Sequence, residues 1–239
     1  RNTLEEMAAA AERLGYEYLA ITDHSASHGF GNHVTADQLW QRIDEVKAFN
    51  DAEKKSKGGH RPRAGAEVEV EGDAALTAMI RPAAVRRAVS NLALNAAFHA
   101  DRVLEALDWV IASIHTSFSN DEDKMTGRML AAIENPHVDC IGHATGRLLN
   151  KRDPYPLNIE KVIAAAEETD TLFEINGSPQ RRDLSDIHAR MAKEAGVKIV
   201  LNTDSHATSS LGYMDYAIAT ARRAWLEKDD ILNTGPWWK

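Results

Sequence analysis

Histidine and carboxylate side chains recur in this sequence at one kind of position, directly after a short apolar segment. The segment that ends at Leu201 leads into Asp204 and His206, and the segment "WVIASI" leads into His115. One such residue alone is more often part of a solvated turn or a helix cap than a ligand. The repetition is harder to attribute to chance, because imidazoles and carboxylates gathered in a buried rim are costly unless metals or other partners satisfy them.

The residue types in this series indicate metal-dependent chemistry. Neutral imidazoles together with carboxylates suit Zn, Mn or Fe, and no cluster of thiolates is present to favour a structural zinc site. Several ligands of both kinds suggest more than one ion, and clustered divalent ions can bind phosphate oxygens and activate water near neutral pH. The pattern therefore predicts phosphoester hydrolysis. In chain order, the polar residues at these positions are Asp23, His24, Glu67, Glu69, His115, His143, Glu174, Asn176, Asp204 and His206.

Alternating apolar patterns predict the elements that would position these residues. The predicted strands are 16–22, 63–72, 107–115, 137–143, 171–177 and 197–204, and the predicted helices are 3–14, 36–56, 121–134, 158–169, 183–195 and 213–227. Thr3 and Glu6 are spaced as a capping box for the first helix. Such an alternation favours a parallel sheet covered by helices, and the carboxyl ends of its strands open on one face, where active sites are built.

Composition narrows the class of protein further. The chain has 239 residues, which is enough for one sizeable domain, and a net charge of −8 argues against broad electrostatic binding of nucleic acid. The single cysteine, Cys140, lies in an apolar segment, so no disulfide framework is possible and we expect a cytoplasmic protein. No charge-free apolar stretch of about 18 residues is present to span a membrane.

Six segments of the sequence resemble successive motifs of the PHP (polymerase and histidinol phosphatase) domain: "AITDHS", "GAEVEV", "LDWVIASIHTSF", "VDCIGHATGRLL", "EINGSPQRRDL" and "IVLNTDSH". Their order and spacing most closely resemble the C-terminal PHP domain of bacterial family X DNA polymerases. The resemblance implies a distorted (β/α)7 TIM-like barrel with up to three Mn, Zn or Fe ions at the strand ends. It also implies phosphoester hydrolysis, in the polymerase branch as 3′–5′ exonuclease and related DNA-end phosphoesterase activity.

The resemblance also implies roles for individual residues. Glu67 would bridge two ions, and Glu67, Asp204 and His206 would be the catalytic residues. Asp23 and Asn176 would hold ligands in place. Arg147 and Arg182 would grip a substrate phosphate, although two surface arginines with solvated heads explain those positions equally well. The full set of metal ligands implied by the resemblance is His24, Glu67, His115, His143, Asp204 and His206.

Two departures from the family pattern qualify these expectations. The family's first strand carries His-x-His and, a few residues on, an Asp, but this sequence begins where that motif would end and contains no His-x-His. We therefore expect a barrel without its first strand, fewer bound ions and impaired activity in the chain as given. Residues 72–104 replace a short connection, and we expect an amphipathic helical insertion there. The expected organisation is one PHP-type domain over residues 1–234, followed by a tail at 235–239.

Three functions stay open at this point. The first is a phosphoesterase that acts on a DNA 3′ end, from a parent chain that also carries a polymerase domain. The second is a small-molecule phosphatase of the histidinol-phosphatase type, for which the partner is a phosphorylated metabolite. The third is a catalytically impaired remnant that binds fewer metals and serves as a structural module.

Overall fold

The structure is a computed structural model that describes residues 2–16, 19–24, 36–56, 88–90 and 109–234. Six parallel strands lie in one sheet in the order of the chain. This arrangement confirms the predicted α/β fold. Closure into a barrel stays a prediction, because β1 and β6 are the end strands of the sheet that the described residues form. The strands are β1 (Thr22–His24), β2 (Ala88–Ser90), β3 (Ile111–Ala112), β4 (Cys140–Ile141), β5 (Leu172–Asn176) and β6 (Ile199–Asn202).

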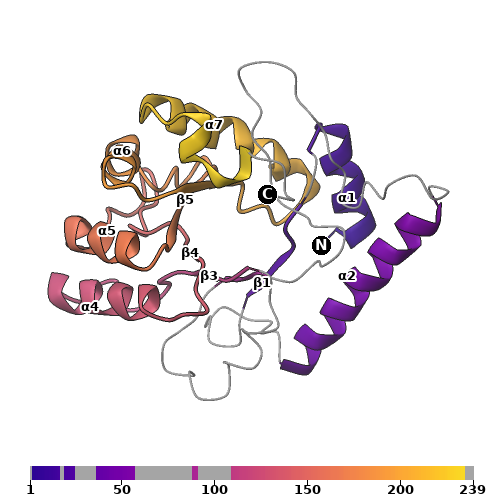
Figure 1. Cartoon of the computed structure of the whole chain (residues 1–239), viewed down its shortest axis with the longest axis horizontal. Coiled ribbons are helices and arrows are strands. Elements are labelled where there is room, and N and C mark those ends of the chain that lie inside the picture. Colours follow the sequence, from indigo (N-terminus) through magenta and orange to yellow (C-terminus); the bar gives the residue numbers. More distant parts are fainter. Residues whose placement is uncertain (1, 17–18, 25–35, 57–87, 91–108, 235–239) are drawn as a thin grey trace.

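Helices alternate with the strands and lie on the outer side of the curved sheet, as Figure 1 shows for α4 to α7. No helix in the described part of the chain is both long enough and apolar enough to cross a bilayer. The α-helices are α1 (Leu4–Arg13), α2 (Ala36–Ser56), α4 (Glu122–Ile133), α5 (Ile159–Glu168), α6 (Asp186–Glu194) and α7 (Met214–Arg223), and three 3-10 helices follow β6, namely η2 (Thr208–Tyr213), η3 (Lys228–Asp230) and η4 (Leu232–Thr234).

Polar side chains fix where the helices begin. Thr3 and Glu6 form the predicted capping box at the start of α1, in which the Thr3 hydroxyl accepts from the Glu6 N–H and the Glu6 carboxylate accepts from the Thr3 N–H. The Asp121 carboxylate accepts from the Lys124 N–H at the start of α4, at 2.9 Å. The Ser185 hydroxyl caps α6 in the same way. Each cap satisfies an N–H group that the helix leaves unpaired.

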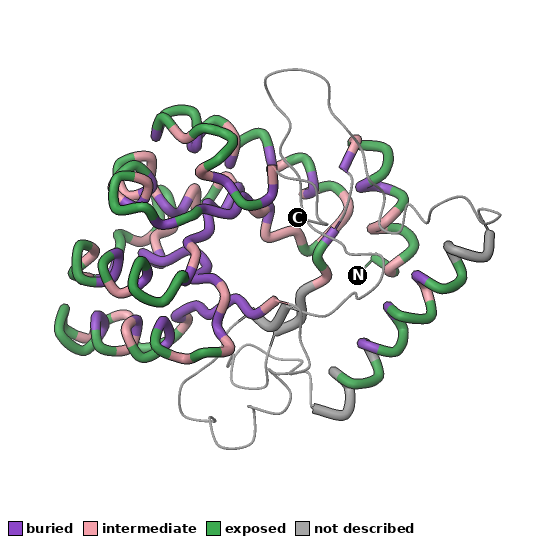
Figure 2. The backbone as a smooth tube through the Cα atoms, viewed as in Figure 1, coloured by how far each residue is buried: buried purple, intermediate pink, exposed green. Residues whose placement is uncertain are grey.

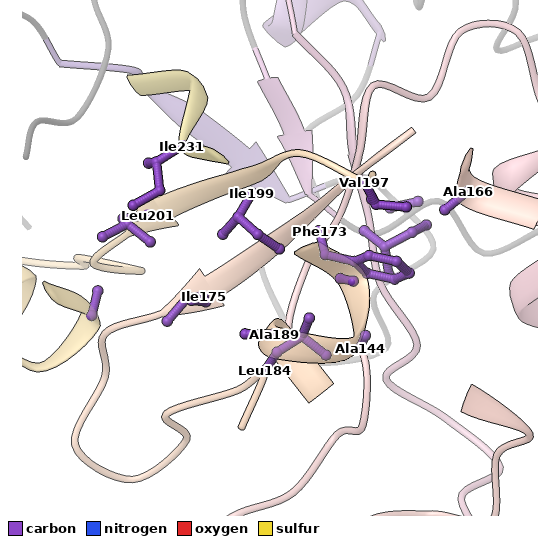
Figure 3. Packing of buried hydrophobic residues seen from close by; sticks show 14 of the residues in the cluster. Ala144, Ala166, Phe173, Ile175, Leu184, Ala189, Val197, Ile199, Leu201 and Ile231 are labelled. Carbon is purple, nitrogen blue, oxygen red and sulfur yellow. The ribbon is translucent and has the colours of Figure 1, made fainter. Parts of the chain in front are cut away.

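The core lies between the strands and the inner sides of the helices, where the buried positions concentrate in Figure 2. Phe173 and Ile175 from β5 are fully buried, as are Ile199 and Leu201 from β6, and Leu184 packs from the loop that follows β5 (Figure 3). Strands in a parallel sheet are covered on both faces, which explains why they are nearly continuous apolar runs in the sequence.

The strand that pairs with β1 in the structure, β2, lies in a segment that the sequence did not predict as a strand. Residues 63–72 lie outside the described residues, and Ala88–Ser90 pairs in parallel with β1. Because these three residues belong to the segment expected to be a helical insertion, that insertion is not helical throughout. Spaced apolar residues in 72–104 favoured a helix locally, but pairing with a neighbouring strand is a tertiary interaction that a local pattern does not reveal.

The outer edge of β6 is covered by the segment that contains η4. Ile231 forms a parallel bridge with Ile199. The Asn233 side chain continues this pairing, because its amide donates to the Leu201 carbonyl at 2.7 Å and accepts from the Leu201 N–H at 3.0 Å. Asn233 is buried. The Asn233 amide therefore makes the hydrogen bonds that a further strand beside β6 would make, and β6 is the strand that leads to Asp204.

Candidate functional site

Two histidines meet where β3 and β4 end. The rings of His115 and His143 lie edge to face, with 4.8 Å between their centroids. His115 is held by the Ser113 hydroxyl, 3.0 Å from its Nε2. His143 is buried and its Nδ1 atom has no hydrogen-bond partner among the described residues. Burial, with the nearby charges of Arg181 and His115, lowers the pKa of His143 well below its ordinary value, so the ring is neutral and has a nitrogen lone pair available to a ligand.

A buried carboxylate connects these histidines to the neighbouring strands. Glu174, in β5, accepts from the backbone N–H of His143 at 2.8 Å and from the Asn176 amide at 3.2 Å through the same oxygen. Its other oxygen accepts from the Asn202 amide at 3.1 Å. Burial, and then the charge of Asp204, raises the pKa of Glu174 to about 7, and the hydrogen bonds oppose this rise. Glu174 therefore fixes the main chain at His143, which has a left-handed φ of 31°.

Asp204 and His206 follow the end of β6. One oxygen of Asp204 accepts from the Asn176 amide at 3.1 Å. The same oxygen lies 3.5 Å from Nε of Arg181, in an ion pair between two partly buried side chains. His206 is more open, with its Nδ1 atom 2.9 Å from the carbonyl oxygen of Asp204. Asn176 thus donates to both Glu174 and Asp204, and joins the ends of β5 and β6 through their side chains.

The two arginines predicted to bind phosphate make other contacts. Arg147 donates through Nε to the carbonyl of Arg181 at 2.9 Å, and its second guanidinium nitrogen donates to the carbonyl of Arg182. The guanidinium of Arg182 lies over the Tyr216 ring, 4.7 Å from the centroid. Arg181, which the sequence did not single out, is the arginine that contacts Asp204. The phosphate role of Arg147 and Arg182 stays a prediction.

The remaining predicted ligands are only partly described. Asp23 and His24 lie in β1, opposite Val89 and Ser90 of β2, so His24 is at the expected strand, but its side chain lies outside the described residues. Glu67 also lies outside them. Within the described part of the chain, no group of three or more His, Cys, Asp and Glu side chains is arranged to hold a metal ion. The structure shows instead two pairs, His115 with His143 and Asp204 with His206.

The chain shares its fold and its sequence motifs with known proteins. A family model for the PHP domain matches residues 1–178. The chain belongs to the PHP domain family. The PHP match includes β1 to β5 and the motifs of His24, Glu67, His115 and His143, and β6 with Asp204 and His206 follows it along the chain.

Relatives of this PHP chain include enzymes of two kinds. The DNA polymerase/3'-5' exonuclease PolX of Bacillus subtilis (strain 168) is 36% identical over 231 residues, which are 97% of this chain and 36% of that protein. A probable phosphatase of Thermoanaerobacter sp. (strain X514) is 36% identical over 141 residues, 55% of each chain. The chain therefore spans about a third of the first relative and about half of the second.

A solved structure supports the fold. The histidinol phosphate phosphatase of Lactococcus lactis subsp. lactis Il1403, crystallised with Zn, L-histidinol and phosphate, aligns with a TM-score of 0.61 over 95% of this chain and 89% of that chain. Only 16% of the residues are identical, so the likeness shows the fold alone. The similarity to PolX over nearly the whole chain agrees with the branch of the PHP family that the motifs suggested.

The donors in this PHP site fit borderline divalent ions. A neutral, buried imidazole nitrogen without a partner is the form in which histidine binds metal, and carboxylate oxygens complete the same kind of ligand set. Sequence reasoning missed the parts that hold these donors, namely Arg181, Asn202 and the hydrogen bonds of Glu174. Glu174 was visible as one more carboxylate in a strand, and its burial could have been inferred from the apolar residues that flank it.

Proposed function

We propose that this chain is a metal-dependent phosphoesterase of the PHP family. The observation that carries the proposal is the placement of His115, His143, Asp204 and His206 after β3, β4 and β6 of one parallel sheet, with Glu174 and Asn176 joining His143 to Asp204 by hydrogen bonds. His24 and Glu67 would complete the ligand set, and Mn, Zn or Fe would be the ions held. The domain would extend over residues 1–234.

The chain's own residues would prepare the site before any substrate arrives. Glu174 fixes the backbone of His143 and, through Asn176, the carboxylate of Asp204, so ligands from different strands are held in one arrangement. When bound, divalent ions would neutralise phosphate charge and activate water. Arg181, which contacts Asp204, would be a further guanidinium able to meet a phosphate oxygen, beside the roles proposed for Arg147 and Arg182.

The preferred substrate is the 3′ end of a DNA strand, cleaved as a 3′–5′ exonuclease or DNA-end phosphoesterase. The similarity to PolX over 97% of this chain supports this choice over a metabolite phosphatase. A polymerase domain of a parent chain would then be a partner of this domain. The buried thiol of Cys140 agrees with the proposed cytoplasmic location.

The test compares two substrates and two variants. The protein is loaded with Mn²⁺, its metal content is measured by elemental analysis, and it is incubated with a 5′-labelled single-stranded oligonucleotide or with L-histidinol phosphate. We expect release of nucleotides from the 3′ end that depends on Mn²⁺ and is lost in His143→Ala and Asp204→Asn. Faster hydrolysis of histidinol phosphate would favour the small-molecule phosphatase. If the protein binds about one metal ion and hydrolyses neither substrate, the chain is instead the catalytically impaired remnant that serves as a structural module.

A further inference from the structure

The contact between Arg181 and Asp204 places a fixed positive charge on a proposed metal ligand. Nε of Arg181 lies 3.5 Å from Oδ2 of Asp204, and the two side chains are 18% and 29% exposed. The Asn176 amide donates to the same oxygen. The Asp204 carboxylate therefore already has a cationic partner and a neutral donor, both supplied by the loop and strand of β5.

The loop that carries Arg181 is held in this position by the loop that follows β4. Arg147 donates to the carbonyl of Arg181, and the N–H of Leu149 donates to the carbonyl of Gln180 at 2.7 Å. The charge of Arg181 also reaches His143, where it lowers the pKa of the imidazole. Its guanidinium thus acts on ligands from two strands, His143 after β4 and Asp204 after β6.

We infer that the Arg181 guanidinium occupies the cation position of Asp204 and exchanges with a divalent ion there. The inference rests on the proposed metal-dependent function, since Asp204 must be a metal ligand for the exchange to occur. Arginine stays protonated in proteins, so its charge cannot be removed by loss of a proton. A divalent ion and a guanidinium that both approach Oδ2 of Asp204 repel one another, and the ion binds this oxygen only when Arg181 moves away.

This exchange has two consequences for the site. Arg181 lowers the affinity for the divalent ion, because part of the binding free energy is used to break the ion pair. Once released from Asp204, the guanidinium can pair with an anion instead. Metal loading would then prepare a basic group for the substrate in the same step.

Manganese affinity measured by isothermal titration calorimetry tests the inference. Arg181→Gln removes the competing cation, and we expect Mn²⁺ to bind at least about five-fold more tightly than in the wild type. Arg152→Gln is the matched control, because Arg152 also lowers the pKa of His143 by its charge but donates to the Gly146 carbonyl and lies over the Phe118 ring. We expect Arg152→Gln to change the affinity by less than two-fold, as no ion pair with Asp204 is lost.

A measurement on the wild type keeps the test independent of how the variants fold. The arginine Nε–H signal of Arg181, assigned by its loss in Arg181→Lys, is expected to shift and exchange faster with water when Zn²⁺ is added. Equal Mn²⁺ affinities of the wild type and Arg181→Gln, or an unchanged signal with the metal bound, would overturn the inference and leave the proposed function intact. An equal gain in Arg152→Gln would also overturn it, since general electrostatics would then suffice. Failure of all three proteins to bind Mn²⁺ would overturn the metal-dependent function itself.

Discussion

Asp183 is a buried carboxylate whose ionisation should lower the stability of the fold. It follows β5, has no exposed surface, and accepts through Oδ2 from the N–H of Thr145 at 3.0 Å. Burial raises its pKa from an ordinary value of 3.8 to about 6, while hydrogen bonding to Thr145 and the charge of Arg147 oppose the rise. The loops after β4 and β5 are therefore joined by a group that holds its proton more tightly in the folded state.

The pH dependence of the free energy of unfolding follows from the difference between the pKa of Asp183 in the folded state and in the unfolded state. Between pH 3.8 and about 6 the folded state binds more protons at Asp183 than the unfolded state does, so the free energy of unfolding falls as the pH rises through this window. A difference of about two pKa units, at about 1.4 kcal/mol each, amounts to about 3 kcal/mol above pH 6. Below pH 3.8 the penalty is absent.

Asp183→Asn keeps the size and the acceptor of the side chain but removes the charge. We expect the variant to gain stability relative to the wild type as the pH rises, by about 3 kcal/mol across the whole window. Urea unfolding followed by tryptophan fluorescence between pH 4 and pH 8, in EDTA, gives the free energies of unfolding of both proteins.

Asp170→Asn provides a matched control. Asp170 is exposed after α5 and has a left-handed φ of 57°, which asparagine tolerates well, so the same substitution removes no burial penalty. If the difference in the free energy of unfolding between Asp183→Asn and the wild type does not vary with pH, ionisation of Asp183 does not destabilise the fold. A difference that shrinks as the pH rises would show that its carboxylate is stabilised in the fold.

Three further substitutions test the supports of the site. Asn233→Ala leaves the buried N–H and C=O groups of Leu201 without partners, and we expect the free energy of unfolding in urea to fall by about 2–4 kcal/mol; a loss similar to that of an exposed Asn→Ala substitution would contradict the role of the amide. Glu174→Ala removes the acceptor for His143 and Asn176, and calorimetry should show Mn²⁺ affinity reduced by about 10- to 100-fold, with a smaller loss in Glu174→Gln; wild-type affinity in both would show that Glu174 does not position the ligands. Gly146→Ala places a Cβ against the Tyr155 ring at a φ of +63°, so the melting temperature should drop by an amount that corresponds to about 2 kcal/mol or more, and an unchanged temperature would show that the loop adapts.

Much of the fold could be predicted because its signals are local. Helices α2, α4 and α5 begin and end within about two residues of the predicted bounds, since apolar period and capping residues act over one or two turns. The strand β2 could not be found in this way. Its residues, Ala88–Ser90, are selected by pairing with β1, from which they are separated by more than sixty residues of sequence.

The site shows the same division between local and tertiary information. His115, His143, Asp204 and His206 were predicted because each follows an apolar strand, and the parallel topology brings such positions to one end of the sheet. The choice among Arg147, Arg181 and Arg182 depends on how the loop after β5 turns. Arg182 has a left-handed φ of 45°, and this local conformation, together with the contacts of Arg147, points Arg181 toward Asp204. Adjacent arginines in a sequence carry no information on which of them a turn will direct inward.

The amide of Asn233 has a consequence for the behaviour of the protein in solution. An uncovered edge strand can recruit a strand from another molecule, and aggregation often begins at such edges. Here the bridge at Ile199 and the amide at Leu201 use the backbone groups that β6 would otherwise present outward. The same few hydrogen bonds that pair the outer edge of β6 also discourage self-association through that edge. Solubility and the alignment of a candidate ligand thus depend on one asparagine.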